Sequence, residues 1–154
     1  MEEESENYYQ ATSDDVNCDE ILPGIFLSSV SAAVNRDLLQ ILEIKSILTV
    51  ANSIEPAFPS HFKYMVIHIE DVGTQDILSH FPSAIKFINE SEGNVLVHCA
   101  NGISRSPTVV SAYVMTKMGI KSSKEALDFV ASKRSCINPN AGFRKQLQAF
   151  GDTL

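Results

Sequence analysis

Residues 98–106 read HCANGISRS and are the most informative stretch of this chain. The short apolar run NVLVH (94–98) leads into it, and the segment SPTVVSAYVMTKM (106–118), which is apolar almost all round, follows it. The first run is typical of a central strand in a parallel sheet, and the second is typical of a helix buried in the middle of a domain. We therefore expect a loop that connects a central strand to the N-terminus of a buried helix.

A loop of this kind predicts a phosphate site. Its backbone N–H groups turn into one concavity, and the helix dipole adds positive potential there. Gly102 allows backbone angles that a side chain would forbid, and Arg105 has a planar fork that matches two phosphoryl oxygens. The residues expected to surround the phosphate are Cys99, Ala100, Asn101, Gly102, Ile103, Ser104 and Arg105.

Cys99 is the candidate nucleophile. A thiol at the floor of an electropositive cup, beside a helix start, is favoured as the reactive thiolate. A cysteine at the end of a buried strand is more often a small core hydrophobe, but the joint pattern of Cys99, Gly102 and Arg105 favours catalysis. The neighbouring His98 is expected to hold the loop by hydrogen bonds and to favour the thiolate of Cys99.

These residues resemble a known family, the cysteine-dependent phosphatases of dual-specificity type. The sequence HCANGISRSPTVVSAYVM (98–115) is similar to their signature loop and the helix behind it, and NPNAGF (138–143) resembles the start of their final helix. The stretch LTVANSIEPAFP (48–59) is closer to small plant-type members, and the resemblance extends over roughly residues 21–150. It implies an α/β fold with a central, mostly parallel five-stranded sheet flanked by helices.

The resemblance also implies a two-step mechanism that needs no metal and no cofactor. A phosphocysteine forms on Cys99 and is then hydrolysed by water. By the same resemblance, the hydroxyl of Ser106 donates a hydrogen bond to the Cys99 sulfur and helps it to leave in the second step. The alternative role of Ser106 is an ordinary helix cap, and the two roles are compatible.

Protonation of the leaving group needs a carboxylic acid from another loop. Three candidates follow the strand expected at residues 64–69: Glu70, Asp71 and Asp76. The resemblance implies an Asp just past this strand, ten residues before an aromatic residue, and Asp71 with Phe81 fits that spacing. Asp76 fits better as the N-cap of the next helix, and strand alternation points Glu70 away from the site.

Strands alternate with helices along the chain, which favours an α/β sandwich rich in parallel strands. Strands are expected within 21–27, 46–50, 64–69 and 94–98, and helices within 30–44, 77–88, 106–118, 122–133 and 140–150. One catalytic domain is expected over residues 21–154, after a disordered acidic leader over residues 1–20. We therefore expect that removal of residues 1–19 leaves the fold and the activity unchanged.

The net charge of −7 comes from this leader, which holds eight of the 19 acidic residues and no Lys or Arg. Eight of the 12 basic residues lie between Arg105 and Lys145. The separation of an acidic leader from a basic C-terminal half suits an anionic substrate. Seven of these basic residues are expected on a solvated helical face: Lys117, Lys121, Lys124, Lys133, Arg134, Arg144 and Lys145. They form no cluster with interleaved aromatic residues, so nucleic acid is not an expected partner.

The cysteine count and the hydropathy pattern bear on location. An odd number of cysteines (three) without a secretory signal favours free thiols, and their spacing does not match a metal site. No apolar run approaches the roughly 18–20 residues that a membrane helix needs. We therefore expect a cytoplasmic or nuclear protein without a membrane partner, and no role is assigned to Cys18 or Cys136.

The expected activity is hydrolysis of phosphotyrosine and of phosphoserine or phosphothreonine in proteins. The side chains of Ala100, Asn101, Ile103 and Ser104 are uncharged, which favours a phosphoprotein over a polyphosphorylated lipid. A signalling kinase is a possible substrate, and a monomer is expected. Two alternatives stay open at this point: a phosphatase of lipid or RNA-end phosphates, and a module that binds phosphate groups without hydrolysing them.

Overall fold

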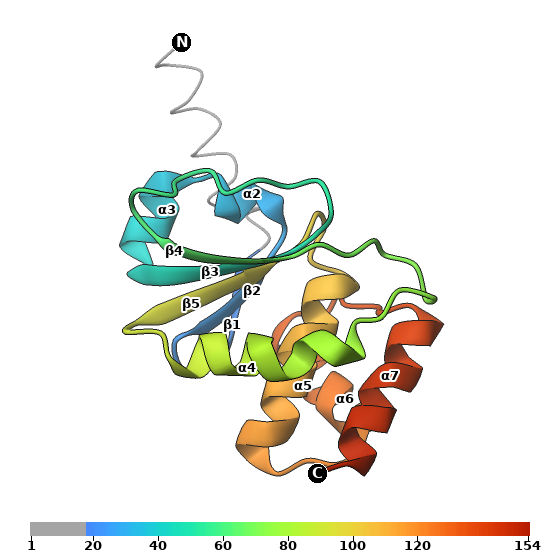
Figure 1. Cartoon of the computed structure of the whole chain (residues 1–154). Helices are drawn as coiled ribbons and strands as arrows, with labels where there is room; N and C mark the ends of the chain where they lie inside the picture. The colour runs from blue at the N-terminus through green and yellow to red at the C-terminus, as the bar shows by residue number, and fades with distance from the viewer. Residues whose placement is uncertain (1–17) are drawn as a thin grey trace.

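One mixed sheet organises the chain. The computed structural model describes residues 18–154, and Figure 1 shows the sheet between two layers of helices. The strand order is β1-β2-β5-β3-β4, in which β1 is antiparallel to β2 and the other neighbours are parallel. The strands are β1 (Cys18–Leu22), β2 (Ile25–Ser28), β3 (Ile44–Val50), β4 (Lys63–Ile67) and β5 (Asn94–His98). This arrangement confirms the predicted mostly parallel five-stranded sheet flanked by helices.

Helices cover both faces of the sheet. Two short helices, α2 (Val30–Ala33) and α3 (Arg36–Ile41), lie on one side, and four longer helices lie on the other (Figure 1). The second group comprises α4 (Phe81–Asn89), α5 (Arg105–Met118), α6 (Ser123–Lys133) and α7 (Ala141–Asp152), and a 3-10 turn, η1 (Leu78–His80), precedes it. Strand β5 is buried on both faces, since Leu96 packs with the first group and its neighbours Val95 and Val97 with the second. This agrees with the central position predicted from its apolar run.

Helix α5 is the central element of the larger core. All ten residues from Ser106 to Met115 are buried, and the helix ends at Gly119, which has a left-handed backbone. Because β5 is parallel to β2 and β3, its carboxyl end lies at the same edge of the sheet as theirs. The N-terminus of α5 therefore faces the edge from which the loops after β3 and β4 also leave.

The first strand begins earlier than expected. Cys18 and Asp19 pair with Ser28 and Leu27 in the antiparallel ladder of β1 and β2, so the predicted domain start at residue 21 is three residues too late. The acidic composition of this stretch obscured the strand, because two of its five residues are carboxylates. The rest of the predicted leader, residues 1–17, lies outside the described residues.

The structure decides two points about the helices that the sequence left open. One or two short helices were expected within residues 30–44, and there are two, α2 and α3, because the Asn35 side chain accepts a hydrogen bond from Leu38 N–H and starts a new helix. The chain before α4 forms η1, and α4 restarts at Phe81 with Pro82 in its first turn, which is the break that Pro82 predicted.

Candidate active site

The loop between β5 and α5 is held from its outer side. Four consecutive carbonyl oxygens, those of residues 100–103, each accept a hydrogen bond from elsewhere in the chain. The donors are Val30 N to Ala100 O (3.0 Å), Arg134 Nη2 to Asn101 O (3.2 Å), Arg134 Nε to Gly102 O (2.9 Å) and Asn138 N to Ile103 O (2.7 Å). The C=O and N–H of a trans peptide point in opposite directions, so the amides of residues 101–104 face away from these donors. Four N–H groups therefore converge on the inner side of the loop.

The concavity on the inner side of this loop is called the cup below, and Cys99 lies at its bottom. The residue is 2 % exposed, its Sγ lies 3.0 Å from Ser106 Oγ, and Gly102 N–H donates to the sulfur at 3.2 Å. Gly102 has a φ of 67°, and a Cβ there would lie 2.6 Å from both Ser28 O and Arg134 Nη2. Both the left-handed backbone and the close packing therefore require glycine.

His98 contacts the backbone of Cys99 and not its sulfur. Its Nδ1 lies 3.1 Å from Cys99 O, and its Nε2 lies 2.9 Å from Thr49 Oγ1. A carbonyl oxygen can only accept, so Nδ1 carries the proton and Nε2 accepts from the threonine hydroxyl. Burial lowers the pKa of His98 to about 4, against the opposing effect of the hydrogen bond to Cys99 O. The ring is therefore neutral near pH 7, and it can hold the loop but supplies no positive charge to a thiolate.

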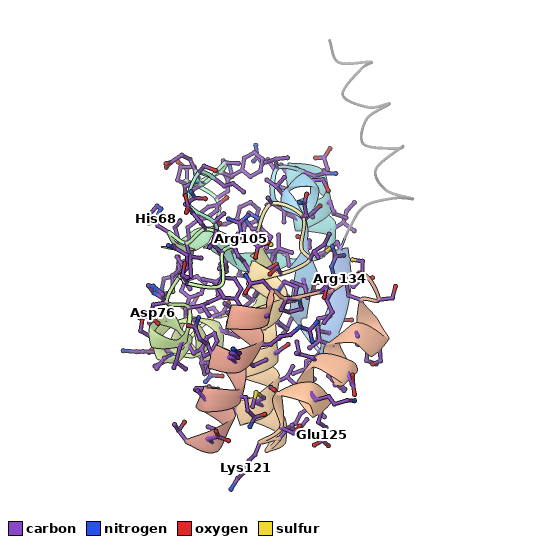
Figure 2. All side chains as sticks on the ribbon, turned by 90° about the vertical axis from the view of Figure 1, so that its right-hand side faces the viewer. His68, Asp76, Arg105, Lys121, Glu125 and Arg134 are labelled. Carbon is purple, nitrogen blue, oxygen red and sulfur yellow. The ribbon has the colours of Figure 1, made fainter. Side chains whose placement is uncertain are left out.

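Arg105, the first residue of α5, reaches across to the ends of β3 and β4. Its Nη1 donates to Ile69 O at 3.0 Å and lies 3.5 Å from Asn52 Oδ1. Figure 2 shows Arg105 and Arg134 near the middle of the molecule, well above Lys121 and Glu125 at its lower end. The guanidinium of Arg105 therefore connects the cup to the loops that follow the two neighbouring strands.

Asp71 lies in the exposed loop after β4, and Asn140 connects it to the cup. Asp71 Oδ1 accepts a hydrogen bond from Asn140 Nδ2 at 2.9 Å. The backbone N–H of Asn140 donates to Ser104 Oγ at 3.0 Å, and its Oδ1 caps α7 by accepting from Phe143 N–H at 2.8 Å. The sequence predicted Asn140 only as the start of the last helix, because an asparagine is favoured at an N-cap position. No signal in the sequence indicated its contact with Asp71.

The other two carboxylate candidates have local partners. Asp76 Oδ1 accepts from Ser79 N–H at 3.1 Å, and this hydrogen bond lowers the pKa of Asp76. It closes the turn before η1, one residue ahead of the N-cap position at Ile77, so Asp76 makes a capping type of hydrogen bond without being the N-cap residue that the sequence predicted. Glu70 Oε1 accepts from Asn52 Nδ2 at 3.3 Å at the exposed surface. Asp71 is connected through Asn140 to Ser104 in the loop between β5 and α5, whereas Glu70 is connected through Asn52 to the guanidinium of Arg105, at 3.5 Å.

Helix α7 also fixes the loop that carries Asp71. Gln146 Oε1 accepts from the N–H groups of Ile77 and Leu78 at 2.9 and 3.0 Å, and its Nε2 donates to Gln75 O at 2.8 Å. At the other end of the loop, Gly142 packs so closely on the Gly73 backbone that a Cβ would overlap it. These contacts were missed from the sequence, since the resemblance marked Gly142 and Gln146 as part of the final helix but did not indicate which residues they contact.

Arg134 is the clearest correction to the sequence analysis. It was expected on a solvated helical face, yet it is 2 % exposed. Helix α6 ends at Lys133, and Arg134 has an extended backbone (φ −140°, ψ 95°) that turns its side chain inwards. Its Nη1 forms an ion pair with Asp19 Oδ2 at 3.0 Å, and its other nitrogens donate to the phosphate loop.

The two remaining cysteines lie outside the cup. Cys18 is half-buried in β1, and burial, with a smaller effect of the Asp19 charge, raises its pKa to about 12. Cys136 is exposed. Within residues 18–154 no group of three or more His, Cys, Asp or Glu side chains is placed to hold a metal ion. In the same part of the chain, no helix has the length and apolar character needed to cross a bilayer.

Comparisons with known proteins agree with the local resemblance. The family model described as the catalytic domain of dual specificity phosphatases matches residues 25–153. The Arabidopsis thaliana protein named dual specificity protein phosphatase 1 is 44% identical over 128 residues, which cover 81% of this chain and 64% of that protein. Dual specificity protein phosphatase 1B of the same plant is 43% identical over 138 residues, or 88% of this chain and 82% of that one.

One solved structure is similar over nearly its whole length. The human tyrosine phosphatase-like serine/threonine/tyrosine-interacting protein superposes with a TM-score of 0.84 at 39% identity, covering 88% of this chain and 96% of that one. That protein is named as phosphatase-like and as an interacting protein. The fold alone therefore does not separate hydrolysis from binding, and that distinction depends on the side chains of the site.

Proposed function

Because the chain belongs to the dual specificity phosphatase family, we propose that it hydrolyses phosphotyrosine and phosphoserine or phosphothreonine in proteins. The observation that carries the proposal is the surroundings of Cys99 Sγ, which lies 3.0 Å from Ser106 Oγ and 3.2 Å from Gly102 N at the centre of the inward amides. A sulfur in this position can attack the phosphorus of a phosphate group bound in the cup.

In the first step the Cys99 thiolate attacks phosphorus. The S–P bond forms as the bond from phosphorus to the substrate oxygen breaks, and Asp71 gives its proton to the departing oxygen. The amides of residues 101–104 and the guanidinium of Arg105 stabilise the three equatorial oxygens, on which negative charge develops. The products of this step are the free protein hydroxyl and a phosphocysteine.

In the second step a water molecule attacks the phosphocysteine. Asp71, now a carboxylate, takes a proton from the water as its oxygen bonds to phosphorus, and the S–P bond breaks. The hydroxyl of Ser106 donates to the sulfur as it becomes a thiolate again, which the 3.0 Å separation of the two atoms allows. Inorganic phosphate leaves, Cys99 is again a thiolate, and Asp71 is again protonated.

The character of the cup supports a phosphoprotein substrate. The side chains of the loop are uncharged apart from Arg105, and the apolar side chain of Ile103 is exposed. The loop therefore suits a substrate with one phosphate group, because it has no lysines to bind a second one. A monomer in the cytoplasm or nucleus that acts on a signalling kinase is consistent with this chemistry. The presence of Cys99, Arg105 and Asp71 together supports hydrolysis over phosphate binding alone.

The test is turnover of an aryl phosphate by the full chain and by Cys99→Ser, with Cys136→Ser as the matched control at an exposed thiol. We expect activity that persists in excess chelator, competition by vanadate, loss of turnover in Cys99→Ser and normal rates in Cys136→Ser. A serine variant that retains activity would exclude the thiolate mechanism. A wild-type chain that binds phosphopeptides but turns none over would indicate a binding module. A substrate panel then separates phosphoproteins from lipid and RNA-end phosphates.

A further inference from the structure

Arg134 lies directly behind the phosphate loop. It comes from the turn after α6, far from the loop in sequence, and Figure 2 labels it at a similar height to Arg105, near the middle of the molecule. Its Nε donates to Gly102 O at 2.9 Å and its Nη2 donates to Asn101 O at 3.2 Å. The planar fork of one guanidinium therefore spans two consecutive carbonyl groups of the cup.

Each of these carbonyls shares a peptide unit with an inward amide. Asn101 O belongs to the unit whose N–H is on Gly102, and Gly102 O to the unit whose N–H is on Ile103. A charged donor on the oxygen fixes the plane of the unit and draws electrons towards that oxygen, which makes the opposite N–H a stronger donor. The positive charge of Arg134 thereby acts on a bound phosphate through two peptide groups without contacting it.

Asp19 completes the arrangement. Its Oδ2 accepts from Arg134 Nη1 at 3.0 Å, so all three nitrogens of the guanidinium are bonded. The Arg134 side chain is 1% exposed, while that of Asp19 is 41% exposed at the start of β1. The carboxylate compensates a charge that burial would otherwise disfavour, and it sets the orientation of the fork.

We propose that Arg134, held by Asp19, is a positioning residue that aims the amides of Gly102 and Ile103 into the cup, where they face Cys99 Sγ and the substrate phosphate. This role rests on the proposed phosphatase function. It differs from a purely structural role, in which Arg134 only ties β1 to the end of α6. A structural role affects the stability of the fold, whereas the positioning role affects the affinity for a phosphate-like anion in a protein that remains folded.

The test uses Arg134→Lys in the full chain, because lysine keeps the charge but cannot span two carbonyls. Arg144→Lys is the matched control, since Arg144 also donates to a carbonyl, Pro139 O at 2.8 Å, but does not contact the phosphate loop. The readouts are the inhibition constant of orthovanadate, kcat and KM for an aryl phosphate, and the melting temperature.

We expect Arg134→Lys to be folded at the assay temperature and to bind vanadate more weakly by on the order of tenfold. That loss is smaller than the effect of removing a donor that touches the anion itself. Arg144→Lys should bind vanadate as the wild type does. A milder variant, Asp19→Asn, keeps an acceptor for Nη1 without its charge and should weaken vanadate binding by about threefold.

Each outcome has a distinct meaning. Vanadate affinity equal to the wild type in a folded Arg134→Lys would overturn the positioning role and leave the phosphatase function intact. If Arg134→Lys does not fold, Asp19→Asn decides, and unchanged vanadate affinity there overturns the role as well. A wild-type chain without vanadate-sensitive turnover would contradict the proposed function itself, before any variant is compared.

Discussion

Asn140 Nδ2 lies 2.9 Å from Asp71 Oδ1, and the backbone N–H of the same asparagine lies 3.0 Å from Ser104 Oγ. One residue at the start of α7 therefore contacts both the proposed acid and the phosphate loop. The distance between the proton donor and the cup is set by the position of a helix N-cap, and not by the conformation of the loop that carries Asp71 alone. The contributions of Asp71 and of Asn140 to the rate can therefore be measured with separate substitutions.

Asp71→Asn should reduce kcat by on the order of 10²–10⁴-fold on a phosphotyrosine peptide, which has a poor leaving group. The loss should shrink on an activated nitroaryl phosphate, because a good leaving group needs little protonation. Asp76→Asn is the control and should be mild with both substrates, since Asn caps a helix nearly as well as Asp. If Asp76→Asn instead gives the leaving-group-dependent loss, the acid is misassigned.

Asn140→Ser should separate the two functions of this asparagine. Serine caps a helix about as well as asparagine, so the free energy of unfolding should change by only a few tenths of a kcal/mol. Serine is too short to reach Asp71, so kcat on the phosphotyrosine peptide should fall, by roughly tenfold, within the range of general acid catalysis. Equal rates for the variant and the wild type would show that the contact at 2.9 Å does not position the acid.

His98 should make the folded state less stable in mild acid. Burial lowers its pKa from 6.5 to about 4 in the folded chain, so below pH 6.5 the unfolded chain binds the proton and the folded chain does not. This contribution to stability is complete above pH 6.5 and is lost as the pH falls towards 4, by about 3 kcal/mol in total.

The measurement is the free energy of unfolding by urea between pH 4 and 7 for the wild type and for His98→Asn. Asparagine retains a donor for Cys99 O but does not titrate, so the difference between the two curves isolates the histidine. A difference that is constant over this pH range would contradict the neutral, buried His98.

The start of β1 should matter more than the sequence indicated. Removal of residues 1–17 leaves Asp19 in place, and we expect unchanged stability and turnover. Removal of residues 1–19 leaves Arg134 buried without its carboxylate, and it should cost about 1–3 kcal/mol, less than a fully buried pair because Asp19 is 41% exposed. Urea unfolding of the two truncated chains checks this, and equal midpoints would contradict it.

The sequence predicted the cup and the central helix because both are local features. The spacing of Cys99, Gly102 and Arg105 and the apolar character of α5 lie within twenty consecutive residues, and the structure places them together. The acid loop required the family resemblance as well, since a loop aspartate has no periodic signal of its own. Apolar and β-branched runs marked β3 and β5 and alternation marked β4, but neither signal marked the start of β1, where two carboxylates stand.

The contacts that hold the cup could not be predicted in this way. Arg134 and Asp19 are 115 residues apart, and Asn140 and Ser104 are 36 apart. Periodicity reports which face of an element is buried, but it does not report which polar partner meets a given side chain across the fold. A charged residue just after a helix end normally reaches solvent, so the burial of Arg134 depends on packing that only the assembled sheet provides.

The four carbonyls of the cup are held by donors from both ends of the chain, Val30 on one side and Arg134 and Asn138 on the other. During synthesis Cys99 is therefore made before Arg134 and Asn138, which hold three of these four carbonyls. At about 5–20 residues per second, roughly 2–8 seconds pass between translation of Cys99 and of Asn140. A nascent chain in that interval has its thiol but lacks three of the four donors that hold the loop around it.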